Sequence, residues 1–122
     1  MRCFFPFIEK KTIETAIRVL QQDTTYDSAV LVRKERMYLW NEQGPIYDIE
    51  HIPNSVDLPE TIIETMGFYA MRCDVAKQLK RRIGNKPYLL EASPLEAIDV
   101  NWPEDAELAD LIAAGQREKG LA

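Results

Sequence analysis

The chain has 122 residues, of which 46% are apolar, and this suffices for one domain with a buried core. Its formal charge of −5 argues against nucleic-acid binding, and it has no run of about 20 apolar residues, so no membrane partner is expected. Pro6 interrupts the apolar N-terminus, which makes it a poor signal peptide. We expect a cytoplasmic protein in which Cys3 and Cys73 stay reduced and pack as small apolar side chains.

The first predicted element is a helix over residues 12–22, capped by Thr12. Its apolar side chains recur at the spacing of one helix face: Ile13, Ala16, Ile17 and Leu20. Residues 28–32 are a short apolar run, typical of a strand covered on both faces. A tight turn at Lys34 and Glu35 then leads into a second strand over residues 36–40.

Residues 41–60 are rich in turn-forming residues and predict a long loop, which in a compact domain is usually functional or an oligomer arm. A strand follows over residues 64–72, and Gly67 inside it indicates a bulge or a close backbone approach. Asp74 is expected to cap a short helix that Gly84 stops.

Residues 87–91 and 97–100 predict two more short strands. The last helix is predicted to begin near Pro103, because three acidic residues occupy its first turns. Since helices and strands are interspersed, the predicted fold class is α/β, with a mixed sheet and flanking helices.

Two oxygen-bearing side chains lie at the end of the strand predicted over residues 97–100. Asp99 and Asn101 are two positions apart, so both point to one face while strand geometry lasts. At the carboxyl end of a strand such a pair can hold Mg²⁺, with water and phosphate oxygens completing an octahedron. The alternative is structural: Asn101 caps the next helix and Asp99 bonds loop amides. The residues alone leave both open.

Other polar residues have simpler explanations. Lys80, Arg81 and Arg82 either meet a phosphate or carboxylate or stabilise the negative end of a helix. His51 has no Cys or Ser partner at a recognisable spacing, so no catalytic role is predicted for it. A loop whose amides could wrap a triphosphate needs closely spaced glycines. The glycines of this chain are isolated: Gly44, Gly67, Gly84, Gly115 and Gly120.

Taken together, these segments resemble the acylneuraminate cytidylyltransferases, a family that also includes enzymes for ketodeoxyoctonate. The resemblance covers nearly the whole chain in the family's order. It is carried by Pro6-Phe7-Ile8 with Thr12-Ile13, Tyr26-Asp27-Ser28 with Leu39-Trp40, Asp57-Leu58-Pro59 with Glu64 to Tyr69, Arg82-Ile83-Gly84 with Pro87, and Glu96 to Asp105.

The resemblance implies one domain over residues 1–122, the C-terminal half of the Rossmann-like fold of nucleotide-diphospho-sugar transferases. The family transfers a cytidylyl group from CTP to an acidic sugar, with Mg²⁺, and releases pyrophosphate. Its N-terminal loop, rich in Gly, Arg and Lys, grips the CTP phosphates and has no counterpart in this sequence. We therefore expect a truncated protein, inactive alone, that a separate N-terminal nucleotide-binding chain would complete.

This sequence keeps only some of the family's functional residues. Asp99 matches the first aspartate of the family's metal-binding pair, and Asn101 stands where the second is usual, so Mg²⁺ should bind more weakly. Substrate binding falls to the stretch that holds Asn54 and Asp57, which lacks the family's usual arginine. Trp102 replaces a small capping residue, which shifts helix capping to Asn101.

Family members also dimerise through the mid-chain segment, here about residues 38–69, so the resemblance implies a homodimer or larger homo-oligomer. An exposed sheet edge and an uncovered apolar layer favour the same outcome. The alternative function is a non-enzymatic dimerising interaction module derived from that family. A small metal-dependent hydrolase using Asp99, Glu104 and Asp105 is a weaker third candidate.

Overall fold

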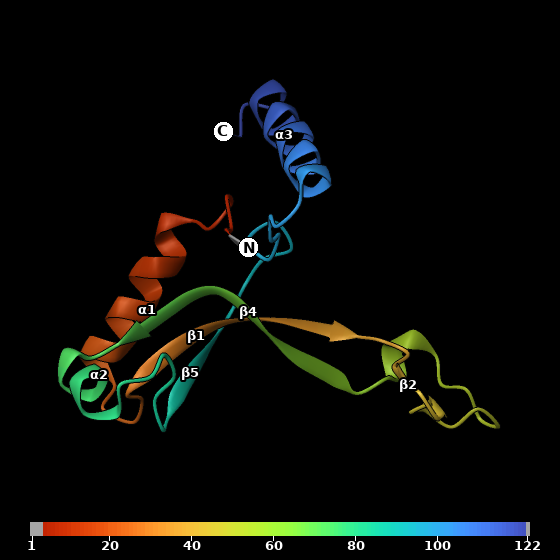
Figure 1. Cartoon of the computed structure of the whole chain (residues 1–122), viewed down its shortest axis with the longest axis horizontal. Helices are drawn as coiled ribbons and strands as arrows, with labels where there is room; N and C mark the ends of the chain where they lie inside the picture. The colour runs from red at the N-terminus through yellow and green to blue at the C-terminus, as the bar shows by residue number, and fades with distance from the viewer. Residues whose placement is uncertain (1–3, 122) are drawn as a thin grey trace.

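The computed structural model describes residues 4–121 as a mixed α/β fold. A three-stranded sheet in the order β4–β1–β5 forms its centre, and helices flank the sheet (Figure 1). The elements in chain order are α1 (Lys10–Gln22), β1 (Ser28–Arg36), β2 (Trp40–Asn41), β3 (Gly44–Pro45), the 3-10 turn η1 (Ser55–Asp57), β4 (Glu60–Met71), α2 (Cys73–Leu79), β5 (Pro87–Glu91) and α3 (Pro103–Glu118). The predicted fold class is confirmed at this level.

The central strand β1 is antiparallel to β4 and parallel to β5. Its first five residues are buried because other elements cover both of their faces, as the apolar run predicts. The apolar stripe of α1 packs on one face of the sheet. The buried cluster there consists of Ala16, Ala29, Leu31, Leu90 and Ala92.

The strand predicted over residues 36–40 is wrong, because no turn forms at Lys34 and Glu35. Instead β1 continues to Arg36, which pairs with Glu60 of β4. Beyond residue 32 its side chains alternate between half-buried and exposed, so a charged stretch fits a strand that is solvated on one face.

Gly67 lies where β4 is irregular, as predicted. The pairing register with β1 shifts between Val30 and Val32, and Met66 has a positive φ of 66°. A Cβ on Gly67 would lie 2.9 Å from the Phe5 ring. The glycine therefore permits both a bulge and a close approach of the N-terminal segment.

Residues 37–59 form a projection that we call the arm, at the end of the molecule opposite α1 and α2 (Figure 1). The short hairpin β2–β3 and the turn η1 give it local structure, whereas the sequence predicted loop over residues 41–60. Leu58 is its one buried residue and packs beside a small apolar hollow. The arm therefore has a minimal core of its own.

Two predicted helix boundaries on α2 are wrong. The helix begins at Cys73, with Arg72 rather than Asp74 at the capping position. It ends at Leu79, and Lys80 in the left-handed conformation follows it, so Gly84 does not stop it. Cys73 is exposed and not packed in the core as expected, and Cys3 lies outside the described residues.

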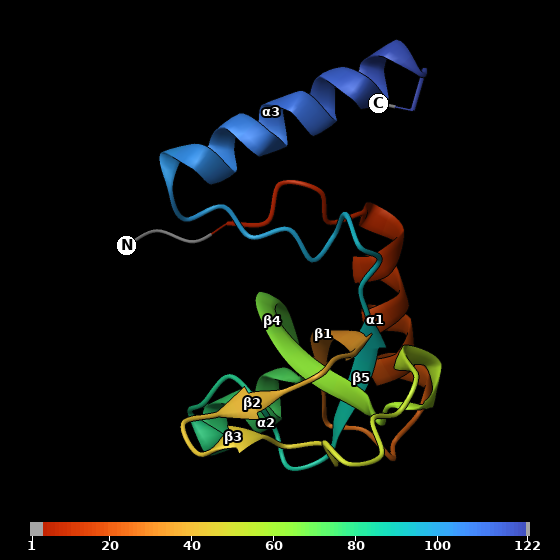
Figure 2. The ribbon, with the colours of Figure 1, turned by 90° about the vertical axis from the view of Figure 1, so that its right-hand side faces the viewer.

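The predicted strand over residues 97–100 is also wrong. Ala97 ends a turn, residues 98 and 99 have no regular structure, and within the described residues only Val100 of this stretch makes a β-bridge, with Phe4. Helix α3 begins at Pro103 as expected and stands apart from the sheet (Figure 2). Within residues 4–121, no helix combines the length and apolarity that crossing a membrane requires.

Candidate functional site

A cavity of about 530 Å³ lies where the parallel pairing of β1 and β5 ends. The last parallel pair is Val32 with Glu91. The cavity is lined by the part of β1 beyond this pair and by the chain from Glu91 to Asp99. Its polar lining includes Arg33, Lys34 and Asp99. In open α/β sheets, ligands bind at this end of parallel strands, so this is the candidate site.

The structure brings Asp99 and Asn101 together, as their spacing predicts. The Asn101 Nδ2 donates a hydrogen bond of 2.8 Å to Asp99 Oδ2. The other carboxylate oxygen of Asp99 is buried and has no hydrogen-bond partner among residues 4–121. Asp99 also lines a second cavity of about 210 Å³ that borders Phe5 and Thr65.

Asn101 does not cap α3, contrary to the structural alternative. Trp102 is the capping residue, and Asp105 on the first turn accepts hydrogen bonds of 3.1 Å from the backbone N–H groups of Asn101 and Trp102. The Asp105 carboxylate thus accepts hydrogen bonds from two backbone N–H groups that have no partner within the helix. The Asn101 side chain is free to orient Asp99.

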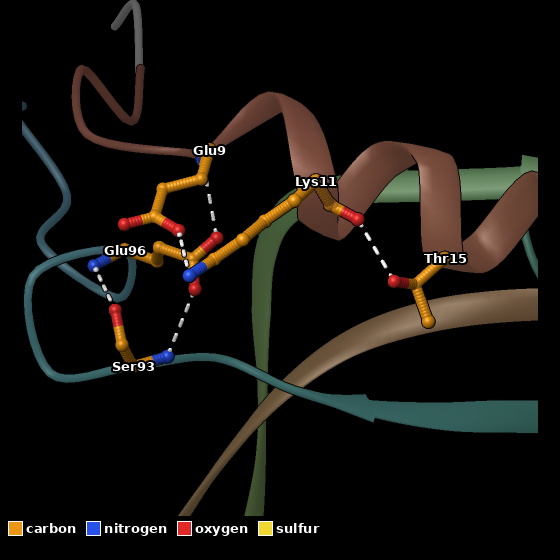
Figure 3. Close-up of polar contacts among 5 residues, drawn as sticks. All are labelled: Glu9, Lys11, Thr15, Ser93 and Glu96. Atoms are coloured by element: carbon orange, nitrogen blue, oxygen red, sulfur yellow. Dashed lines mark hydrogen bonds and ion pairs between the residues drawn. The ribbon is translucent and has the colours of Figure 1, made fainter.

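Glu96 anchors the turn that carries Asp99, and the sequence prediction missed it. This residue is only 4% exposed, and its two carboxylate oxygens each accept a 3.1 Å hydrogen bond, from the backbone N–H groups of Glu9 and Ser93 (Figure 3). In return the Ser93 hydroxyl accepts one from the Glu96 backbone N–H. The Ser-x-x-Glu spacing of a capping box was the available signal.

Burial by itself would raise the pKa of Glu96, but hydrogen bonds from the Thr12 side chain and from the Ser93 and Glu9 backbones outweigh it, so the pKa lies below its ordinary value. Since Glu9 and Thr12 belong to the start of α1, the carboxylate also satisfies donors at that helix terminus. The ionised Glu96 therefore ties α1 to the turn.

Each cation of the cavity wall lies near a carboxylate. Arg33 Nε lies 3.4 Å from Glu35 Oε1, yet this buried nitrogen makes no hydrogen bond within the described part of the chain. Lys34 Nζ lies 3.7 Å from Glu91 Oε2 and 3.8 Å from Glu60 Oε1. Both cations line the cavity, a feature that the sequence prediction did not include.

The predicted substrate-binding residues lie elsewhere. Asn54 and Asp57 are exposed on the arm, where the Asp57 N–H donates a 2.9 Å hydrogen bond to the Asn54 carbonyl. Neither lines the two cavities beside Asp99. Within one chain, the structure does not bring them to the candidate site.

The donor set at Asp99 limits what cation it can hold. One carboxylate oxygen is available, and within residues 4–121 no three His, Cys, Asp or Glu side chains gather into a metal site. Mg²⁺ in phosphate-handling proteins is often held by one or two carboxylates plus water and substrate phosphate. The residues present fit a Mg²⁺ ion of that kind.

Neither of two comparisons with known proteins found a relative. No family model matches the chain, and no curated protein matches it either. The functional assignment therefore depends on the motifs of the chain and on the geometry of the site.

Proposed function

We propose that the chain is the sugar-acid- and cation-binding portion of an acylneuraminate-type cytidylyltransferase, with the Rossmann-like fold completed by a nucleotide-binding half. The observation that carries this proposal is the position of Asp99, with an unpartnered carboxylate oxygen at the carboxyl end of parallel strands. The other acids of the same block have distinct tasks. Glu96 anchors the turn and Asp105 caps α3.

In this proposal Asp99 holds Mg²⁺, with Asn101 fixing the carboxylate through its amide hydrogen bond. The ion, when bound, neutralises charge on the transferring phosphate. Arg33 and Lys34 border the same cavity, each beside a carboxylate, and in this proposal they are the groups that an anionic ligand contacts.

A binding experiment tests the site directly. Mg²⁺ with an acylneuraminate or ketodeoxyoctonate should raise the melting temperature in proportion to the logarithm of ligand concentration, with stabilisation of about 2.7 kcal/mol at a hundredfold excess over Kd. Asp99→Asn should remove the increase, and Asp110→Asn on exposed α3 should keep it. An equal increase in both variants would contradict the assignment of Asp99.

Catalysis needs a nucleotide-binding half in addition to these residues in this proposal. The five glycines are isolated, so no loop of closely spaced amides is present to wrap the CTP phosphates. We expect no pyrophosphate release when the chain alone is incubated with CTP, Mg²⁺ and either sugar acid. Turnover by the purified chain would contradict this part of the proposal.

The same lineage implies association of two copies through residues 38–69, and the exposed apolar side chains of the arm support it. Trp40 is 65% exposed and Val56 is 75% exposed. Because these residues lie on the arm and Asp99 does not, a non-enzymatic dimerising module is the second candidate function. It predicts association without any thermal response to CTP, Mg²⁺ or a sugar acid.

A further inference from the structure

Two exposed segments of the chain carry opposite charge. The arm has four carboxylates and no Lys or Arg: Glu42, Asp48, Glu50 and Asp57. Residues 77–86, which we call the basic segment, run from the end of α2 to the start of β5 and have no carboxylate. Their five cations are Lys77, Lys80, Arg81, Arg82 and Lys86. A protein with a net charge of −5 thus concentrates positive charge in one place.

Much of this charge has no ion-pair partner in the part of the chain that the structure describes. Among the ion pairs of residues 4–121, none includes Glu42, Glu50 or Asp57, and Asp48 pairs only with His51. The lysines of the basic segment also lack ion-pair partners among residues 4–121.

Within the described residues, no carboxylate pairs with Lys77, Lys80 or Lys86. Arg82 contacts Glu64 and the Tyr69 ring of its own chain, and Arg81 bonds Asn85. The three lysines are exposed and free to meet a carboxylate outside the chain.

The two segments lie at opposite ends of the long axis of the molecule (Figure 1). The arm of one chain therefore cannot fold back onto the basic segment of the same chain. A second copy with its axis reversed places each arm at the basic segment of the other. This arrangement repeats one contact twice about a two-fold axis and closes as a dimer.

Charge argues against contact between two arms. Such an interface would place four carboxylates of one copy near four of the other without a Lys or Arg, and like charges at an interface are costly. Against the basic segment, the same carboxylates meet cations. The apolar side chains support the pairing, since the arm has an apolar hollow of about 220 Å³ and Leu89 beside the basic segment is 44% exposed.

We infer that the chain forms a reciprocal dimer in which the acidic arm of each copy docks on the basic segment of the other. The inference deepens the association proposed above and does not depend on nucleotide chemistry.

Charge reversal provides the test. Glu42, Glu50 and Asp57 are changed together to Lys in an arm variant, and Lys77, Lys80 and Lys86 together to Glu in a basic-segment variant. Each variant alone should dimerise at least about tenfold more weakly than the unchanged chain, measured by sedimentation velocity, because attraction becomes repulsion at both contacts. Mixed in equal amounts, the two variants should form a heterodimer, since every contact is again between opposite charges.

A matched control changes Glu107, Asp110 and Glu118 of exposed α3 to Lys, which alters the net charge as the arm variant does. It should dimerise like the unchanged chain. Raising NaCl from about 0.1 M to about 1 M shortens the Debye length from about 10 Å to about 3 Å and should weaken the unchanged dimer.

Three outcomes would overturn the inference. One is a monomeric unchanged chain, which would also overturn the association through residues 38–69. Another is a basic-segment variant that dimerises normally, which would leave that association standing. The third is failure of the mixed variants to recover dimerisation although each one unfolds cooperatively. None of these outcomes bears on the binding of Mg²⁺ and sugar acid at Asp99.

Discussion

Gly84 is a residue at which the fold leaves no room for a side chain. It is buried, its N–H donates a 3.1 Å hydrogen bond to Ser28 Oγ, and a Cβ there would collide with the Asp27 carboxylate. That carboxylate cannot move freely, because it accepts hydrogen bonds of 2.8 and 2.9 Å from the backbone N–H groups of Asn85 and Lys86. Gly84→Ala should lower the free energy of unfolding by about 1–3 kcal/mol in urea titrations.

Gly115 provides the control for this substitution. It lies within α3, and apart from its chain neighbours and its own helix backbone no atom of the described residues lies within 4 Å of a Cβ built there. Gly115→Ala should leave stability unchanged or raise it by up to about 1 kcal/mol, because alanine favours the helix. Equal destabilisation by both substitutions would show that the Asp27 contact is not the cause.

Glu96 gives the fold an acid-sensitive contact. Its pKa is below the ordinary value in the folded chain, so its stabilisation is present above the unfolded-state pKa of about 4.3 and is lost as the pH falls through the lower folded-state pKa. Glu96→Gln leaves one backbone N–H without an acceptor and should cost about 1–3 kcal/mol at pH 7.

The pH profile separates this effect from a general loss of packing. Melting temperatures of the Glu96→Gln variant should fall less steeply between about pH 5 and pH 3 than those of the unchanged chain. The melting temperature of the variant should still depend on pH in acid, because Asp27 also has a lowered pKa. Burial favours a raised pKa for Asp27, but the backbone hydrogen bonds from Lys86 and Asn85 lower it overall. Parallel profiles for the two proteins would exclude the proposed role of Glu96.

At the scale of elements, Arg72 holds the end of α1 against the sheet. This residue follows β4, and its guanidinium donates hydrogen bonds to the carbonyls of Leu20, Asp23 and Tyr26. The last turn of α1 has no basic residue of its own, so Arg72 supplies the cationic donor at this end of the helix. Arg72→Met keeps the apolar stem and should destabilise the chain by about 2–3 kcal/mol in thermal unfolding.

Arg18→Met is the matched control, since Arg18 is exposed on α1 and, among residues 4–121, donates a side-chain hydrogen bond only to Thr15. It should change stability by less than about 0.5 kcal/mol. If the two variants unfold alike, the carbonyl contacts of Arg72 contribute nothing beyond a surface charge.

The spacing of apolar residues predicted the helices and strands that bury one face or both faces. The apolar stripe of α1 and the short run of β5 were found because each packs on the core. The prediction of a strand over residues 97–100 failed because a short apolar run does not distinguish a strand from a half-buried irregular segment. The Asp99 pair was found from its spacing, whereas Arg33 entered the site only through pairing of β1 with β5, which is non-local.

At the scale of the whole molecule, the arm and the sheet are separable structures. Arg36 and Glu60 are paired across β1 and β4, so the two strands already meet at the base of the arm. The buried Leu58 packs near arm residues such as Leu39 and Tyr47 and not in the cluster beneath α1. The arm therefore adds a surface for association more than it adds to the central core.

Replacing residues 37–59 by Asn-Gly tests this division, because a two-residue turn of that sequence closes an antiparallel pair such as Arg36 with Glu60. The shortened chain should unfold cooperatively in circular dichroism and sediment as a monomer at concentrations at which the full chain is a dimer. The rise in its melting temperature with Mg²⁺ and sugar acid should persist if Asp99 binds them without the arm. Loss of cooperative unfolding would show instead that the arm and the sheet share one core.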